Sequence, residues 1–293
     1  MPCYHPITGY RSKTVNPSGK RSIVFNPSEG FIDLTVELPC GQCIGCRLDR
    51  SRSWAVRCMH ENQLHDKSCF LTLTFDDEHL DPKKSLVKAD FQNFMKRLRR
   101  YYEPTRIRFM HCGEYGERYN RPHHHAILFG IDFEDKELFQ VNNDTKLYTS
   151  KTLQNLWKKG FCTIGEVTFD SAAYVARYIT KKITGKPAKE HYGERLPEYN
   201  TSSNRPGIGA DWLLKYASDV YPDDFIVIRN NITCKPPKYY DDIYHNFEPF
   251  LIDKIKAKRF AKAKSNLDNQ TEARLTIRER LTYIKLNELK RDI

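Results

Sequence analysis

Hydrophobic and polar residues alternate through the middle of the chain in patterns that predict short strands and amphipathic helices. The predicted strands are Cys69–Phe75, Arg106–Cys112, Pro122–Gly130 and Cys162–Phe169. The predicted helices, with apolar residues at helical spacing, are Asp90–Tyr102, Lys151–Lys159 and Ser171–Ile183. This order predicts an α+β fold with a mainly antiparallel sheet of about four to five strands, flanked by helices that we expect on one side of it.

The composition changes on both sides of this central part, which predicts three consecutive domains. Residues 1–68 form a cysteine-rich module with short strands at Ser22–Phe25 and Phe31–Leu38 and a basic helix from about Leu48 to Leu64. Residues 69–185 hold the sheet. Residues 186–293 are first rich in turn formers, then include a short helix near Trp212–Tyr216 and a strand near Phe225–Arg229, and become helical and basic from about Asp242.

Bulk composition narrows the class of protein. The chain has 293 residues, of which 39% are hydrophobic, so a packed core is expected. Its net charge of +11 favours a polyanionic partner, nucleic acid before membrane, although a basic enzyme without such a partner would look the same. No run approaches the ~18 apolar residues of a spanning helix, and the start lacks the apolar core of a signal peptide. We therefore expect an intracellular protein.

Three consecutive histidines suggest a metal site. On an extended segment His123 and His125 point to one face and His124 to the other, because side chains alternate along a strand. If the two neighbouring strands pair as a hairpin, Glu114 approaches His123 and His125. One carboxylate and two imidazoles accept a hard divalent ion such as Mg²⁺ or Mn²⁺, which would polarise a phosphate oxygen. The ordinary alternative is a surface patch of histidines.

A pair of tyrosines follows in a predicted helix. Tyr174 and Tyr178 are four residues apart and Lys181 is three further on, so all three share one helical face. A lysine there can stabilise a phenolate or a phosphate charge. Tyrosine is a weak nucleophile at its free pKa of ~10, so it needs such a cation or a metal-activated phosphate. With seventeen tyrosines in the chain, ordinary core packing is the alternative.

Clustered cysteines indicate a second metal site, a structural one. Cys40, Cys43 and Cys46 lie within seven residues, and Cys3 can supply the fourth ligand of a tetrahedral zinc ion, with Cys58 as a competing fourth ligand. The chain has nine cysteines, an odd number that excludes a fully paired disulfide framework. Reduced cysteines in a glycine-rich loop, or an iron–sulfur cluster, are the alternatives.

Basic residues occur in runs near the first two predicted helices and in the C-terminal region, which favours a nucleic-acid track over isolated solvated faces. Nearby aromatics such as Trp54, Tyr101 and Tyr102 suit the stacking of unpaired bases. The residues that we expect to contact DNA are Arg97, Arg100, Arg121 and Lys182.

The order of these motifs resembles a known family. The segments are Phe70-Leu-Thr-Leu-Thr-Phe75, Cys112-Gly-Glu-Tyr-Gly116, Arg121-Pro-His-His-His-Ala-Ile127 and Tyr174-Val-Ala-Arg-Tyr-Ile-Thr-Lys181. Together they are similar to the replication initiators of gokushovirus-like microviruses, small circular single-stranded DNA bacteriophages, which are His-hydrophobic-His (HUH) endonucleases. The resemblance covers residues 69–182, and the runs Pro39-Cys-Gly-Gln-Cys-Ile-Gly-Cys-Arg47 and Arg205-Pro-Gly-Ile-Gly209 are similar to the same branch.

The resemblance implies an HUH endonuclease core with an RRM-like fold and a role for each motif residue. His123 and His125 match the paired metal-binding histidines, with Glu114 as third ligand, while Tyr174 and Tyr178 match the nucleophiles and Lys181 the lysine after them. The position between the two histidines is usually bulky and apolar, whereas here it is His124.

The implied activity is initiation of rolling-circle replication. Unpaired or locally melted DNA at the viral origin is nicked through a 5′-phosphotyrosine, and strand transfer later recircularises the displaced strand. Host polymerase and helicase are implied partners, and the cytoplasm of the bacterial host is the implied location.

Three rival interpretations stay open at this point. They are a transposase-type HUH nuclease, a phosphoesterase that uses water, and a non-catalytic zinc-containing regulator that binds nucleic acid. The chain has no Gly-x4-Gly-Lys-Ser/Thr loop, so we expect no helicase activity of its own.

Overall fold

The computed structural model describes residues 3–116, 119–142, 145–181, 183, 185–229 and 232–288, without the side chains of residues 177–181, 186 and 229. It divides into two compact units. The sheet unit is Arg50–Lys256, and the terminal unit joins the residues up to Asp49 to those from Ala257 onward. These units do not follow the three consecutive segments expected from the sequence, because one of them combines both ends of the chain.

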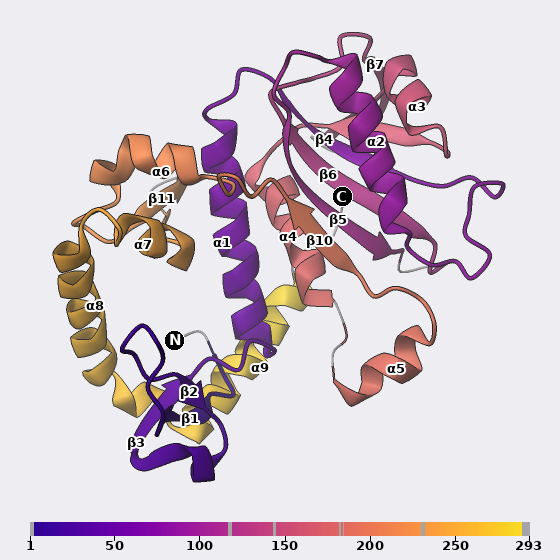
Figure 1. The fold of residues 1–293 in the computed structure, drawn as a ribbon. Coiled ribbons are helices and arrows are strands. Elements are labelled where there is room, and N and C mark those ends of the chain that lie inside the picture. The colour runs from indigo at the N-terminus through magenta and orange to yellow at the C-terminus, as the bar shows by residue number, and fades with distance from the viewer. Residues whose placement is uncertain are drawn as a thin grey trace. The chain divides into compact units, whose positions relative to one another are not determined.

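The elements of the sheet unit carry the labels of Figure 1. Its strands are β4 (Ser68–Leu73), β5 (Arg108–Tyr115), β6 (Pro122–Phe129), β7 (Glu137–Asn142), β8 (Thr145–Thr149), β9 (Cys162–Gly165), β10 (Tyr199–Ser202), β11 (Ile226–Arg229) and β12 (Ile232–Cys234). Its helices are α2 (Lys88–Tyr101), α3 (Lys151–Trp157), α4 (Phe169–Lys181), α5 (Lys186–Tyr192), α6 (Ala210–Tyr216) and α7 (Lys238–Tyr244). Helices α1 (Ile44–Asn62) and α8 (Pro249–Lys264) run from one unit into the other.

The expected α+β class is confirmed, and the main sheet is antiparallel in the order β10-β5-β6-β4-β9-β8-β7. The expectation that helices cover one side is wrong. Helices α2 and α3 pack on one face, and α1 and α4 on the other (Figure 1). The reason lies in the central strands: the run Ala126–Phe129 is buried at every position, so both faces of β6 are apolar and each needs a cover.

The sheet also has more strands than the four to five expected. The hairpin β7–β8 extends one edge, and β10 pairs with β5 at the other. Every residue of β7 is exposed, and β10 is the polar segment Tyr-Asn-Thr-Ser. Edge strands with little buried surface lack the alternation on which strand prediction depends, so the sequence pattern did not reveal them.

The terminal unit contains a small sheet and two helical segments. Its strands are β1 (Ile7–Ser12), β2 (Ile23–Val24) and β3 (Gly30–Leu38), in the order β2-β1-β3, and its longest helix is α9 (Glu272–Glu288). Short 3-10 turns occur in this unit at Pro27–Glu29 and Leu267–Gln270, and in the sheet unit at Ala217–Asp219. The expected C-terminal helices are thus present. Within the described residues, every helix is too short or too polar to cross a bilayer.

Candidate metal and nucleophile site

Strand register brings three metal-ligating side chains together on one face of the main sheet. Strands β5 and β6 form the expected hairpin, in which Glu114 lies directly opposite His123 and Cys112 lies opposite His125. Residues two apart on β6 share a face, so Glu114 meets both histidines, one across the hairpin and one diagonally. One ligand atom from each of Glu114, His123 and His125 lies within 4.8 Å of the others.

The hydrogen bonds of His123 define which of its nitrogens faces the carboxylate. Its Nδ1 lies 3.2 Å from the carbonyl oxygen of Arg121, and a carbonyl can only accept, so Nδ1 carries the proton. Nε2 lies 2.6 Å from Glu114 Oε1, a distance at which a proton or a cation must lie between the two atoms. When the ring is protonated, Nε2 donates to the carboxylate as an ion pair. When the ring is neutral, Nε2 offers a lone pair that can bind a metal ion.

His125 has the same arrangement with a different partner. Its Nε2 lies 3.0 Å from the same Glu114 Oε1, while its Nδ1 lies 3.0 Å from Oγ1 of Thr72. Thr72 is opposite His125 in the register of β4 with β6, and the ring of Phe70 stacks on the imidazole at 5.5 Å. An outer partner on the second ring nitrogen sets the tautomer and ring orientation of a metal-binding histidine.

Glu114 is nearly enclosed, with 3% of its side chain exposed, compared with 17% for His123. Burial favours its neutral form, but the hydrogen bonds to His123 and His125 outweigh this effect and hold its pKa below the usual value. Among the described residues, Glu114 Oε2 has no hydrogen-bond partner. A buried carboxylate oxygen without a partner is costly, and a divalent ion would satisfy it. The donor set and this oxygen both fit a bound metal ion.

The middle histidine lies on the opposite face, as the alternation predicts. His124 is fully buried between the rings of Phe75 and Trp157, and its Nδ1 lies 3.1 Å from Nε2 of His111. Burial, reinforced by the charges of its two neighbours in sequence, lowers the pKa of His124 to about 3. It is thus a neutral core residue in the position where the resembling family usually has an apolar one.

Helix α4 brings Tyr174 to the metal-ligating face. Its ring packs edge-on against His125, with centroids 5.1 Å apart, and lies 6.3 Å from the ring of Phe70. Ala172 and Val175 anchor the helix in the core beneath it. The backbone of Tyr178 and Lys181 continues the same helix, but their side chains are outside the described residues, as is Lys182 altogether.

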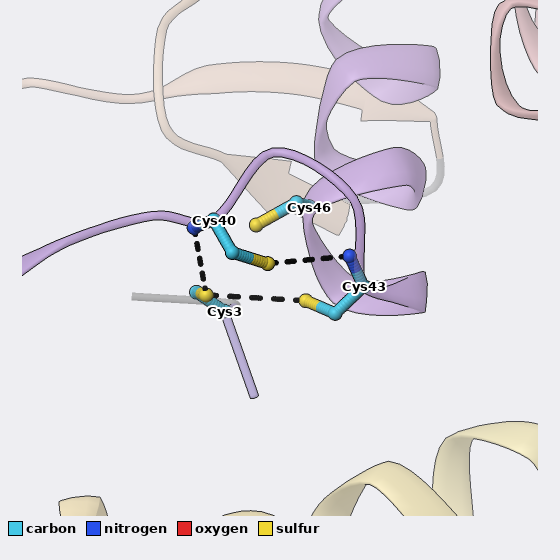
Figure 2. A group of neighbouring side chains, drawn as sticks. All are labelled: Cys3, Cys40, Cys43 and Cys46. Atoms are coloured by element: carbon cyan, nitrogen blue, oxygen red, sulfur yellow. Dashed lines mark hydrogen bonds between the residues drawn. The ribbon is translucent and has the colours of Figure 1, made fainter. Parts of the chain in front are cut away.

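The four expected cysteines lie together in the terminal unit. The Sγ atoms of Cys3, Cys40, Cys43 and Cys46 all lie within 4.8 Å of one another (Figure 2). Burial would raise the pKa of Cys43, but hydrogen bonds from the backbone N–H groups of Tyr4 and Cys46 and from the other thiols lower it to about 6. Cys58, the competing ligand, is instead packed in the core of the sheet unit.

The arginines expected to contact DNA have partners within the protein. Arg97 donates from Nε to the carbonyl oxygen of Leu156 and from a terminal nitrogen to that of Trp157, which ties α2 to the end of α3. Arg121 donates to Asp77 Oδ1 and to the carbonyl oxygen of Phe75. Each guanidinium has five N–H groups, so both retain donors for a phosphate.

Arg100 lines a pocket of about 590 Å³, three of whose arginines, Arg106, Arg108 and Arg205, were not indicated by the sequence. The arginines of this pocket are Arg99, Arg100, Arg106, Arg108 and Arg205, and Glu103 also lines it. The pocket lies at the start of β5, six residues from Glu114, so the two are separated by about 20 Å along the strand. It is therefore distinct from the metal-ligating group. Its members come from two segments, residues 99–108 and 203–205, so the basic run that ends at Arg100 indicated only part of it.

Thr72 and Phe70 are the other residues that sequence reasoning missed as parts of the site. Both belong to the Phe70–Phe75 motif, but nothing in the motif itself says that its first threonine lies opposite His125. Pairing of β4 with β6 would have been needed to find them.

Comparisons with known proteins agree with the motif order. Residues 68–183 match the family described as Replication-associated protein ORF2/G2P. Over 244 residues the chain is 36% identical to Replication-associated protein VP4 of Bdellovibrio phage phiMH2K, covering 78% of this chain and 76% of that protein. It is also 36% identical to Replication-associated protein ORF2 of Spiroplasma virus 4, covering 78% and 75%.

A third relative is Replication-associated protein ORF4 of Chlamydia phage 1, which is 31% identical over 70% of this chain and 53% of that protein. No solved structure gives a significant match.

Proposed function

The chain belongs to the replication-associated protein family of the microviruses, and from this premise we propose that it nicks the viral origin to initiate rolling-circle replication. The single observation that carries the proposal is the packing of Tyr174 against His125, one of three side chains that could hold a metal ion. A candidate nucleophile and a candidate metal centre thus share one face of the sheet. Neither a structural metal site nor ordinary core packing requires that pairing.

Each residue has a definite part in the proposed reaction. Glu114, His123 and His125 would hold Mg²⁺ or Mn²⁺, which when bound polarises the scissile phosphate and neutralises developing charge. The phenol oxygen of Tyr174 or Tyr178 attacks phosphorus and loses its proton, while the P–O3′ bond breaks and the released 3′-oxygen takes up a proton. The product is a 5′-phosphotyrosine and a free 3′-hydroxyl. Because the phosphodiester energy is retained, no nucleotide cofactor is needed for resealing.

The second tyrosine would complete the cycle. After one round it cleaves the regenerated origin, and the new 3′-hydroxyl attacks the first phosphotyrosine, closing the displaced strand into a circle. Lys181, one turn beyond Tyr178 on α4, would stabilise the phenolate or phosphate charge. The spacing of the two tyrosines, four residues apart on one helix, suits this alternation.

The proposed DNA track uses positive charge on both sides of the site. Arg121 precedes the histidine strand and keeps 39% of its side chain exposed, and Lys182 follows α4. The arginine pocket at the start of β5 would hold backbone phosphates further along the strand. Arg97 would contribute only those of its N–H groups that do not donate to the carbonyl oxygens of Leu156 and Trp157. Host polymerase and helicase would act on the nicked origin, in the cytoplasm of the infected bacterium.

A denaturing gel tests the proposal. The protein is incubated with its own single-stranded genome DNA and Mn²⁺, as wild type, Tyr174→Phe, Tyr178→Phe and the double variant, with Tyr283→Phe as an exposed-tyrosine control. We expect a metal-dependent, DNA-linked protein band that the double variant lacks and the control retains. Cleavage without the band would support a phosphoesterase that uses water, and binding without cleavage a regulator. Either result would overturn the proposal.

A further inference from the structure

The cysteine group has the geometry of a tetrahedral thiolate site. The sulfurs of Cys3 and Cys43 lie 3.9 Å apart, far beyond a disulfide bond. A tetrahedral zinc ion with Zn–S bonds of about 2.3 Å would separate its sulfurs by about 3.8 Å. All four side chains point to a common centre from two segments of chain, the residues before β1 and the loop from β3 into α1 (Figure 2). Four sulfur donors leave no open position for substrate, which is typical of a structural site.

Backbone groups around the sulfurs also suit bound thiolates. The N–H groups of Tyr4, Cys40 and Cys43 donate to the sulfurs of Cys43, Cys3 and Cys40, each at 3.3 Å. Cys3, Cys43 and Cys46 are buried, yet the apolar cluster around them consists of the cysteines themselves and Tyr4. Most residues of β3 are exposed, so the sheet beside them supplies little core. A unit with so little apolar burial needs another source of folding free energy, and metal binding is a usual one.

The two residues after Cys3 carry side chains that contact α9. Tyr4 Oη lies 2.7 Å from Thr282 Oγ1, and His5 Nε2 lies 2.8 Å from Glu279 Oε2. The guanidinium of Arg278 lies over the Tyr4 ring at 5.9 Å. Among the described residues of α9, Leu275 alone is buried. The other apolar side chains of this helix are partly or largely exposed. Contacts with Tyr4 and His5 are therefore a substantial part of what holds the helix.

We propose that the four cysteines bind one Zn²⁺ and that this ion, by fixing Cys3, holds Tyr4 and His5 against α9. Zinc occupancy is then a condition for the packing of α9 within the terminal unit. Thiolates are soft ligands that favour Zn²⁺ over the hard ion expected at Glu114, so the two groups select different metals. This proposal is independent of nicking, and it stands or falls by metal content and by the stability of α9.

Metal content is measured first, by elemental analysis of the full-length protein. The background carries Glu114→Gln and His123→Ala, so that the sheet site does not contribute. We expect one zinc per chain, lost in Cys40→Ser/Cys43→Ser and kept in Cys58→Ala, a buried-cysteine control outside the group. Substitution by Co²⁺ should give the absorption of a tetrahedral thiolate complex. No metal, or iron with the absorption of an iron–sulfur cluster, would overturn the zinc assignment.

Amide hydrogen exchange in residues 272–288 tests the link to α9. Removing zinc from the wild-type chain with a chelator should speed exchange there by about tenfold or more, and added Zn²⁺ should restore protection. Cys3→His, which keeps a zinc ligand, should stay close to wild type, whereas Tyr4→Ala should keep the zinc and lose the protection. This comparison uses the wild-type chain, so it holds even if the double serine variant does not fold. Unchanged exchange on chelation would overturn the link.

Discussion

The chain holds two groups of side chains that could each bind a metal ion, and they are built in opposite ways. Glu114, His123 and His125 are set by the register of two strands inside a large core, and the outer partner of His125 comes from a third strand. The four cysteines lie in a unit with little apolar core and are held mainly by one another and by backbone N–H groups.

The contrast teaches how donor set and surroundings distinguish the two roles. Oxygen and nitrogen donors on a rigid sheet, with an unpartnered carboxylate oxygen and a tyrosine nearby, suit a site that exchanges ligands during a reaction. Four sulfurs that close around one centre suit an ion that stays bound. We therefore expect removal of metal to stop the reaction at the first group and to loosen the structure at the second.

The largest expected effect is on the reaction itself. Glu114→Gln should slow single-turnover nicking with Mn²⁺ by on the order of 10²–10³-fold, because the charge that holds the cation is lost. DNA binding should persist, since the substitution leaves the basic track intact. Glu137→Gln, on exposed β7, and His124→Leu, on the opposite face, should both keep nicking. A Glu114→Gln variant within threefold of wild type would remove the metal site from the account.

The next effect is on the stability of the sheet unit, to which the buried carboxylate of Glu61 contributes independently of metal. Glu61 on α1 accepts hydrogen bonds from Arg108 at the start of β5 and from the N–H of Gly209. Burial opposes the charge of Glu61, but hydrogen bonds from His65, Arg108 and Gly209 lower its pKa to about 2 from 4.5. Glu61→Gln should therefore reduce the free energy of unfolding by roughly 3 kcal/mol at neutral pH.

The pH dependence of this loss has a definite sign. A depressed carboxyl pKa stabilises the fold fully above about pH 4.5, and this stabilisation disappears as pH falls toward about 2. The gap between wild type and Glu61→Gln, measured by denaturant unfolding of the metal-free proteins, should shrink over that window. Glu134→Gln, which removes an exposed partner of Lys67, is the control with little expected change. A difference in free energy of unfolding that stays constant with pH would contradict the depressed pKa of Glu61.

A smaller effect is expected from the outer partner of His125. Thr72→Val keeps the shape of the side chain but removes the hydroxyl at His125 Nδ1, so Mn²⁺ affinity should fall by about 10–100-fold. Thr72→Ser should recover most of it. Calorimetric titration with Mn²⁺ measures both. The rate of nicking at saturating Mn²⁺ should change much less than the Mn²⁺ affinity, because Thr72 acts by orienting His125. Equal losses of rate and affinity would count against this positioning role.

The smallest effect concerns DNA contacts outside the site. Arg106→Gln/Arg205→Gln removes two positive charges from the pocket at the start of β5. Single-strand affinity should fall several-fold, and the slope of log affinity against log salt should decrease by about 1.4. Arg280→Gln/Lys285→Gln removes the same charge from the exposed surface of α9 and should leave the slope nearly unchanged. An unchanged slope in the pocket variant would place the DNA elsewhere.

Local patterns in the sequence predicted the central strands, the amphipathic helices and the run Cys40, Cys43 and Cys46, since these depend on residues close in the chain. Alternation also placed His123 and His125 on one face, and the structure agrees. The sequence did not predict which residues far apart in the chain lie next to each other. Thr72 meets His125 through the pairing of β4 with β6, and Arg205 joins Arg106 from almost a hundred residues away. The polar edge strand β10 has too little buried surface to leave a pattern.

The most direct test of the central claim is mass spectrometry of the trapped protein–DNA adduct after digestion with nuclease and trypsin. Cleavage after Arg177 separates the two tyrosines, placing Tyr174 in Gly160–Arg177 and Tyr178 in Tyr178–Lys181. The account predicts a residual nucleotide, joined through a 5′-phosphate, on the tyrosine of one or both peptides. A nucleotide attached to any other residue, or origin cleavage that leaves both peptides unmodified, would contradict it.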